Sequence, residues 1–226
     1  MAIREDQGST IKKETEKSAR IREKNWKSCL FFLFGPENDR LPRKLLGRGQ
    51  NNLEEVEIRM IKLLRVDDRL IHGQVATTWT KTLQADSIIV ANDEVIHNEL
   101  QIIALKLAVP AGMKVAIRSV EDAIGLLRNP KAQPMKIFVV VNHPRDALRI
   151  AEAVPETVEG INIGNYYGSK QLRTEEKIKL DRNIYLDPQD VDTLKKICAL
   201  PIEFTIQMVP HEPKKKVSDC LQHLGC

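Results

Sequence analysis

The sequence predicts an α/β fold with a mostly parallel central sheet of about seven strands and helices on both faces. From Met60 onward, short apolar runs alternate with segments of helical periodicity. Runs that are apolar throughout are typical of strands covered on both faces. The expected strands lie at residues 61–64, 87–90, 114–117, 137–141, 160–163, 183–186 and 203–206.

The helices expected between these strands begin with N-terminal capping signals. They lie at residues 74–81, 98–108, 120–127, 144–153 and 188–198. Ser119 is placed to cap the third helix, and Asp187-Pro188 supplies a cap and a proline at the first helical position of the last. Ligands of such sheets bind beyond the carboxyl ends of the strands. The loops to inspect are therefore 65–73, 91–95, 142–143 and 164–169.

Composition narrows the class of protein. The chain has 226 residues, of which 42% are hydrophobic, so a sizeable core can form. A net charge of +4 permits anionic ligands but lacks the dense basic stripe of nucleic-acid binders. The four cysteines have no zinc-ligand spacing, and no metal is expected. Because no apolar run approaches the ~20 residues that span a bilayer, a cytoplasmic protein is expected.

Residues 1–59 differ from the remainder. They are rich in polar and charged residues with little periodicity, and we expect them to bury too little apolar surface to offset the entropy of ordering. Glu54-Glu55-Val56 precedes Met60 and can be encoded by a purine-rich stretch of the ribosome-binding kind. The segment is expected to be a mis-annotated upstream extension or a disordered basic leader; the alternative is a genuine appendage that docks a partner. At the other end, residues 220–226 are expected to form a polar tail.

The loop after the first strand concentrates reactive groups. Arg65 and Arg69 are fixed cations that can clamp phosphate oxygens. Asp67 and Asp68 can orient an imidazole and set its tautomer. His72 is a nucleophile available at neutral pH. The combination predicts a transient phosphohistidine site.

The residues that follow His72 favour an anion as well. Gly73 lets the backbone approach a ligand closely, and Gln74 begins a helix whose N-terminal amides and dipole attract negative charge. Neither a GxxxxGK[ST] loop nor a GxGxxG turn is present, so nucleotide binding has no support. Spacing alone leaves open whether the loop is functional or an ordinary charged surface.

Several segments together are similar to a known family. Residues 65–75 read RVDDRLIHGQV and are followed by Thr77 and Trp79. They resemble the active-site segment of enzyme IIB of the bacterial sugar phosphotransferase system, in its mannose/fructose/sorbose branch. The likeness continues at 89–95, 108–112 and 161–164, ends near 207–210, and covers about residues 60–219.

This resemblance implies a protein-phosphohistidine–sugar phosphotransferase. His72 would accept phosphate on Nδ1 from a phosphohistidine of the IIA protein or domain. It would pass the phosphate to a hexose imported by the IIC/IID membrane permease subunits. Arg69 would be a phosphate clamp and Asp67 an orienting carboxylate, with no metal or nucleotide cofactor. The resemblance also implies peripheral attachment to the inner membrane face through the permease, and a homodimer is among the expected states.

Other polar residues at the same edge are candidates for the pocket. They are Asp68, Asn92, Asp93, Asn162 and Gly164. For Asp93 the alternative is a cap of the following helix.

Two further features of this edge leave their role open. His143 is expected to start a helix. Tyr166-Tyr167 departs from the family pattern, either at the rim of the pocket or in loop packing.

Two other functions remain alternatives. One is a regulatory module whose phosphorylation at His72 acts on a transcription regulator. The other, a nucleic-acid binder that uses the basic N-terminal segment, would show steep salt dependence. The identity of the sugar lies outside this sequence, since it depends largely on the permease subunits.

Overall fold

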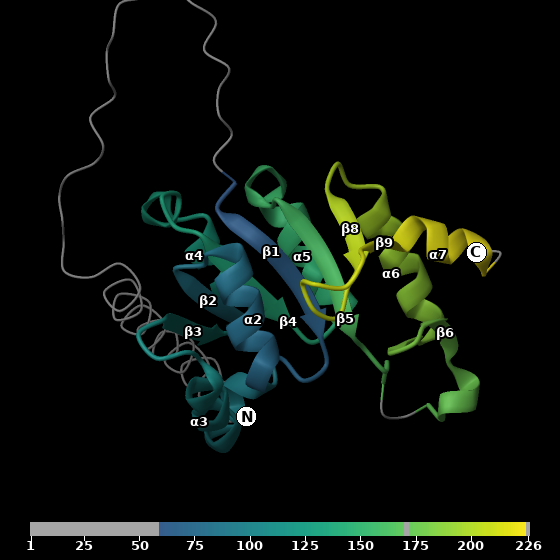
Figure 1. Cartoon of the computed structure of the whole chain (residues 1–226), viewed down its shortest axis with the longest axis horizontal. Coiled ribbons are helices and arrows are strands. Elements are labelled where there is room, and N and C mark those ends of the chain that lie inside the picture. The colour runs from purple at the N-terminus through teal and green to yellow at the C-terminus, as the bar shows by residue number, and fades with distance from the viewer. Residues whose placement is uncertain (1–58, 170–171, 225–226) are drawn as a thin grey trace, which may run out of the picture. The chain divides into compact units, whose positions relative to one another are not determined.

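The computed structural model describes residues 59–169 and 172–224, apart from the side chains of Gln74 and Val75. Seven strands form one sheet in the order β3-β2-β4-β1-β5-β8-β9 (Figure 1). Every neighbouring pair is parallel except β8 and β9. The strands are β1 (Ile61–Asp67), β2 (Ser87–Ala91), β3 (Lys114–Arg118), β4 (Ile137–Val141), β5 (Gly160–Asn165), β8 (Glu203–Ile206) and β9 (Lys215–Lys216). The expected fold class is confirmed.

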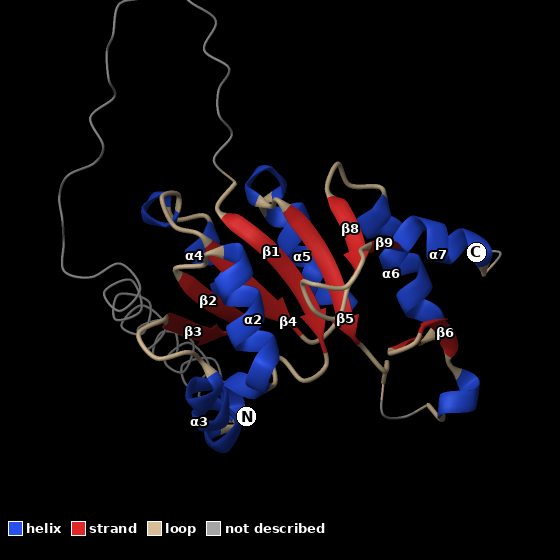
Figure 2. Ribbon diagram, viewed as in Figure 1, coloured by secondary structure: helices blue, strands red, loops and turns tan. Residues whose placement is uncertain are grey.

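Helices cover both faces of this sheet. On one face lies α2, with α3 at its lower end, while α4 and α5 lie on the other and α6 packs against α5 (Figures 1 and 2). The α-helices are α2 (Gly73–Leu83), α3 (Glu99–Ala108), α4 (Val120–Leu127), α5 (Pro144–Ala153), α6 (Pro188–Cys198) and α7 (Val217–His223). Short 3-10 helices lie at Val95–His97, Pro130–Ala132, Pro155–Thr157 and Thr174–Glu176. In the portion of the chain that the structure describes, none of the helices is long and apolar enough to cross a membrane.

The core beneath α2 and α3 explains why β1 ends where it does. Leu70 and Ile71, in the loop that leaves β1, pack with Trp79 of α2 and Leu105 of α3 against the central strands. Burying each such side chain contributes roughly 1.5–3 kcal/mol. The loop is thus pinned at its apolar pair, and the polar residues on either side of that pair stay at the edge of the sheet.

The capping signals are confirmed. Ser119 Oγ accepts a hydrogen bond from the Asp122 N–H at 3.1 Å, at the start of α4. Asp187 is the N-cap of α6 with Pro188 in its first turn. His143 starts α5, where its Nδ1 accepts the Arg145 N–H at 3.2 Å.

One expected strand is in a different sheet. The apolar run at 183–186 forms β7 (Ile184–Leu186), which pairs antiparallel with β6 (Ile178–Asp181) in a separate two-stranded sheet. The place beside β5 is taken by β8, which pairs with it along four residues. The seventh strand of the main sheet is instead the two-lysine β9. Periodicity predicts that a segment is extended, but the partner depends on which sheet edge is free.

Residues 220–223 of the expected polar tail lie in α7 (Val217–His223). Lys215 and Lys216 pair with β8, and α7 follows with Val217 and Leu221 buried. These two side chains are four residues apart, so a helix places them on one face. The predictions for residues 1–59 lie outside the described residues, Arg59 excepted.

Candidate functional site

The loop between β1 and α2 lies at the carboxyl edge of the sheet. The Leu70 N–H donates to the Asp67 carbonyl at 2.9 Å, and Leu70 has a left-handed φ of 55°, so the chain turns sharply after the strand. His72 follows in extended conformation as the N-cap residue of α2, and Gly73 has a φ of 37°. The turn therefore returns the His72 imidazole toward the end of β1, at the positive end of the helix dipole.

The His72 ring faces a buried carboxylate. Nε2 of His72 lies 3.5 Å from Oδ1 of Asp67, whose side chain is 0% exposed, while the imidazole is 26% exposed. At this distance the two groups interact electrostatically, and Nε2 is buried without a hydrogen-bond partner in the described part of the chain. Catalytic contacts of this kind are often long before the reaction partner arrives. A carboxylate facing Nε2 favours a proton on that nitrogen and leaves the lone pair on Nδ1.

The surroundings also set the charge of His72. Burial lowers the pKa of the imidazole below its usual 6.5; Asp67 opposes the shift, while Arg69 and Arg65 add to it. The net shift is downward, so the ring is neutral at neutral pH. A neutral imidazole has the free lone pair that nucleophilic attack requires.

Arg65 does not lie where a ligand could reach it. Its side chain is 0% exposed, and Nε and Nη2 donate to Asp67 Oδ2 at 3.2 and 2.8 Å. Nη1 donates to Asn162 Oδ1 and to the Gln207 carbonyl, and Nη2 donates to the Met208 carbonyl at 3.2 Å. Burial lowers the pKa of the guanidinium, and Asp67 opposes that effect. A direct phosphate contact of Arg65 stays a prediction, and it would require one of these hydrogen bonds to be broken, because the donors of Arg65 are directed into the protein.

Arg69 has the opposite placement. Its backbone N–H donates to Asp67 Oδ1 at 3.2 Å, which ties the loop to the strand end. Its side chain is exposed. Within the described residues, the guanidinium makes neither a hydrogen bond nor an ion pair. It is a cation beside His72 whose donors are available to an incoming anion.

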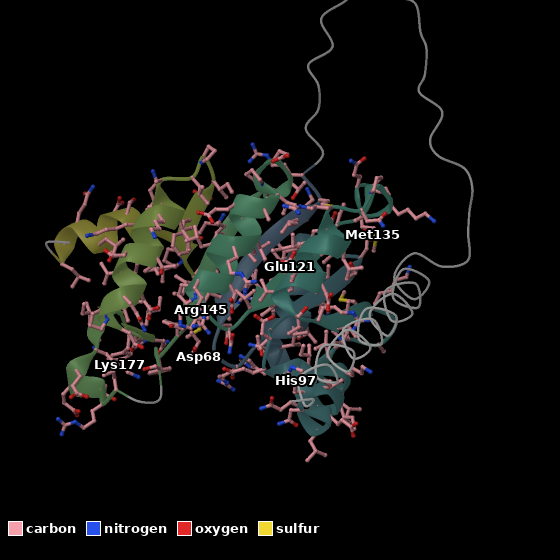
Figure 3. The ribbon with its side chains drawn as sticks, turned by 180° about the vertical axis from the view of Figure 1, so that it is seen from behind. Asp68, His97, Glu121, Met135, Arg145 and Lys177 are labelled. Carbon is pink, nitrogen blue, oxygen red and sulfur yellow. The ribbon has the colours of Figure 1, made fainter. Side chains whose placement is uncertain are left out.

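Asp68 is directed away from His72. Its Oδ2 accepts the Tyr167 N–H at 2.6 Å, and its own N–H donates to the Asn165 carbonyl at 2.8 Å. Burial raises the pKa of the carboxyl group to about 6; the Tyr167 bond and Lys177 oppose the rise. Figure 3 shows Asp68 on the same edge of the molecule as Lys177. Asp68 thus clips the loop to the chain that leaves β5.

Two of the other predicted pocket residues join the Arg65 network. Asn162 accepts a bond from Arg65 and donates to the Thr205 carbonyl at 3.3 Å. Gly164 lies where the pairing of β1 with β5 shifts register. A Cβ at this position would overlap the Arg65 guanidinium. Both residues therefore contribute to the placement of Arg65 rather than line a pocket.

Asn92 and Asp93 belong to the next loop and form local turns. Asn92 is buried, and its Oδ1 accepts the N–H groups of Glu94 and Val95 at 2.9 and 2.7 Å. Asp93 accepts the N–H of Val120 at 2.8 Å, so it caps α4 and not the helix that follows it. Neither makes a contact with His72 among the described residues.

The spacing of residues in the sequence does not indicate three residues that contact the Arg65 guanidinium. Besides the carbonyls of Gln207 and Met208, the Trp79 ring lies 5.2 Å from the guanidinium carbon, and its Nε1 donates to the Met208 carbonyl at 3.3 Å. The available signal was the family resemblance, which covered all three residues. Within residues 59–169 and 172–224, no three side chains of the usual metal-binding kinds converge on a site.

The two tyrosines after β5 have different roles. Tyr166 is 1% exposed, and its hydroxyl donates to Asp190 Oδ2 at 2.9 Å. Because that proton is used, His143 Nε2 must donate to the Tyr166 oxygen, 3.0 Å away. Tyr167 is half-exposed and stacks on Tyr185 with 5.3 Å between ring centres. Loop packing is confirmed for Tyr166, while a place for Tyr167 at the rim of a pocket stays a prediction.

Comparison with known proteins gives consistent matches. Residues 61–225 match the model of a family described as the PTS system sorbose subfamily IIB component. A probable phosphotransferase enzyme IIB component of Streptococcus pyogenes serotype M6 is 42% identical over 160 residues, which are 70% of this chain and 98% of that protein. The sorbose-specific EIIB component of Klebsiella pneumoniae is 33% identical over 70% of this chain and 93% of its own length.

Solved structures agree with the sequence matches. The IIBSor domain of the sorbose permease from Klebsiella pneumoniae superposes with a TM-score of 0.64 at 33% identity, covering 73% of this chain and 97% of that one. The N-acetylgalactosamine-specific IIB component 1 from Escherichia coli gives a TM-score of 0.60 at 28% identity, with coverages of 69% and 98%. Sequence and fold therefore point to the same family.

Proposed function

The chain belongs to the sorbose subfamily of IIB components of the sugar phosphotransferase system, and we propose that His72 is its phosphoryl carrier. Membership alone supports a sugar-specific phosphotransferase role. The observation that supports His72 is its position at the start of α2, with Nε2 turned toward the buried Asp67 carboxylate. The remaining ring nitrogen, Nδ1, is then the nucleophile.

The geometry fits transfer between two imidazoles. The Nδ1 lone pair attacks the phosphorus of a phosphohistidine on the IIA donor, and the donor nitrogen leaves with the electron pair of the broken P–N bond. With Nε2 still protonated, the His72 ring becomes cationic, and the Asp67 carboxylate stabilises that charge. In the second step a sugar hydroxyl attacks the phosphorus and gives up its proton to water, the P–N bond breaks toward Nδ1, and the proton on Nε2 makes the imidazole a better leaving group.

Arg69 and the first N–H groups of α2 bind the phosphoryl group during transfer. Arg69 is an exposed cation beside His72, and the first N–H groups of α2, from Gly73 and Gln74, are at the positive end of the helix. Phosphoryl transfer depends mainly on positioning and on dispersing the charge of the equatorial oxygens. We assign this task to Arg69 rather than Arg65.

The partners follow from this assignment. The donor is a IIA protein or domain, and the acceptor is a hexose presented by IIC/IID permease subunits at the cytoplasmic face of the membrane. A relative supports the pairing with a IIA donor. The mannose-specific EIIAB component of Escherichia coli is 30% identical to this chain across 49% of its own length. Neither a nucleic acid nor a cofactor takes part, and a homodimer is compatible with the transfer.

Labelling with radioactive phosphoenolpyruvate, the general carrier proteins and a matching IIA tests the proposal. We expect one acid-labile, base-stable phosphoryl group, which is lost in His72→Ala. His97→Ala is the matched control because His97 is an exposed histidine outside the loop, and it should label like the unmodified protein. Labelling that survives in His72→Ala would exclude the assignment.

A further inference from the structure

We propose that Arg65 is a positioning residue for phosphoryl transfer, which holds Asp67 so that Asp67 fixes the tautomer of His72, and that Gly164 provides the space Arg65 needs. The inference rests on the proposed role of His72 and extends it to the layer beneath the loop. It reverses the more obvious use of an arginine in such a motif, which is direct contact with the phosphate.

Every donor of Arg65 is already used. A guanidinium has five N–H groups and no acceptor. The side chain makes five hydrogen bonds, of which two go to Asp67 Oδ2 and the other three to Asn162 Oδ1 and to the carbonyls of Gln207 and Met208. Its face is covered by Trp79. A phosphate could be bound by Arg65 only if one of these bonds were broken in the interior.

These hydrogen bonds give the two carboxylate oxygens of Asp67 different partners. Oδ2 accepts both N–H groups that Arg65 directs at it, at 3.2 and 2.8 Å. Oδ1 contacts the loop after β1: it accepts the Arg69 N–H at 3.2 Å and lies 3.5 Å from His72 Nε2. Arg65 holds Oδ2 with two N–H groups and the Arg69 N–H holds Oδ1, so rotation of the carboxylate would break hydrogen bonds at both oxygens, and Oδ1 keeps its direction toward His72. That direction selects the proton on Nε2 and leaves Nδ1 free to react.

Gly164 is the counterpart of this arrangement. Its Cβ position coincides with the guanidinium of Arg65, so any other residue there would displace the fork. The same strand contains a glycine without this constraint. A Cβ at Gly160 would meet only the Glu203 carbonyl, at 3.8 Å, which is an ordinary contact. Gly164→Ala and Gly160→Ala are therefore a matched pair in β5, and only the first acts on Arg65.

Two measurements on this pair test the inference. The ring ¹⁵N shifts of His72 report its tautomer, and single-turnover labelling from phosphorylated IIA reports the transfer rate. In the unmodified protein and in Gly160→Ala, the neutral ring should carry its proton on Nε2. In Gly164→Ala we expect a mixture of tautomers and a lower transfer rate. The decrease should be roughly 10- to 100-fold, by analogy with metal-binding histidines whose hydrogen-bond partner is removed.

Arg65→Lys is the second variant, in case Gly164→Ala does not fold. Lysine keeps the charge but concentrates its donors on one atom, so it cannot hold Oδ2 in a fork while reaching the carbonyls of Gln207 and Met208. The same change of tautomer and rate is expected. A folded Gly164→Ala or Arg65→Lys protein with the tautomer of the unmodified protein and a transfer rate within about twofold of it would overturn the positioning role.

The two proposals fail in different ways. If the unmodified protein takes up no phosphoryl group, the carrier role of His72 fails, while the tautomer measurement still tests Arg65. If the unmodified protein is labelled on His72 and both variants match it in rate and tautomer, the carrier role stands and the role of Arg65 fails.

Discussion

Oδ1 of Asp67 lies 3.5 Å from Nε2 of His72, and the positive charge of Arg69 acts on the same ring. Asp67 raises the pKa of the imidazole, and Arg69 lowers it. Burial adds to the effect of Arg69, and the balance favours the neutral ring. The loop thus keeps the His72 imidazole neutral, and the Asp67 carboxylate lies where it can stabilise the positive charge that phosphorylation creates on the ring.

The pH dependence of labelling follows from this balance. Because burial lowers the pKa of His72, half-protonation should occur below pH 6.5, and labelling should fall only as the pH drops through that midpoint. An NMR titration of the His72 ring protons gives the midpoint directly. The unfolded chain binds this proton more readily, so the contribution of His72 to stability is present above pH 6.5 and is lost in acid. A midpoint above pH 6.5 would contradict the prediction.

Replacing Arg69 should change both charge and rate. Arg69→Gln removes a cation that lowers the pKa of His72, so the midpoint of its titration should rise. Loss of the phosphate contact should reduce the transfer rate on the order of 100-fold, by analogy with removal of other charge-stabilising donors. Lys106→Gln removes an exposed cation from α3 and should change neither quantity. Equal titration midpoints in the two variants would exclude the electrostatic role of Arg69.

Removing Asp67 should destabilise the protein strongly. Asp67→Ala leaves the guanidinium of Arg65 buried without its counter-ion, which costs about 3–5 kcal/mol. Asp181→Ala is the comparison, because Asp181 pairs at 2.7 Å with the half-exposed Lys215. Such a surface pair contributes about 0–1 kcal/mol. Urea unfolding of the two variants, followed by circular dichroism, should show this difference in the free energy of unfolding.

Asp68 should make stability depend on pH in a defined range. Its pKa is about 6 in the folded protein against an ordinary 3.8, so the folded state holds this proton more tightly than the unfolded state. The contribution of Asp68 therefore falls as the pH rises from 3.8 to about 6 and is constant above. Asp68→Asn should remove this slope while keeping an acceptor for the Tyr167 N–H; Asp68→Ala should lose both. Thermal unfolding at several pH values checks the prediction.

The tyrosine pair offers a comparison of neighbours. Tyr166→Phe removes a buried hydroxyl that bonds to Asp190 and His143, and should lower the free energy of unfolding by about 1–3 kcal/mol. Tyr167→Phe keeps the half-exposed ring that stacks on Tyr185 and should change stability by less than about 0.5 kcal/mol. Equal effects in urea unfolding would show that the Tyr166 hydroxyl contributes nothing specific.

Most of the architecture was predictable from local pattern. Six of the seven expected strands lie in the main sheet, because fully apolar runs such as 137–141 have one stable environment, a sheet covered on both sides. The run at 183–186 was placed in the wrong sheet. Its partner, β6, is only four residues long, and Ile178 and Leu180 alternate there with two charged residues, a pattern too short to indicate a strand. β9 was missed as well, since two lysines indicate a solvated segment rather than a strand.

The sequence by itself determined that a reactive loop follows the first strand and that His72 stands at the start of a helix, because strand and helix signals are local. Only the tertiary structure decided how each pair of like residues divides its work. Arg65 and Arg69 are indistinguishable as residue types, but three of the five hydrogen bonds of Arg65 go to acceptors 97 to 143 positions away in the chain. Asp67 faces His72, whereas Asp68 binds Tyr167, 99 positions away, because folding places β5 beside β1. Contacts at such separations leave no spacing pattern in the sequence, so the buried cation could be told from the exposed one only after the strands had been placed side by side.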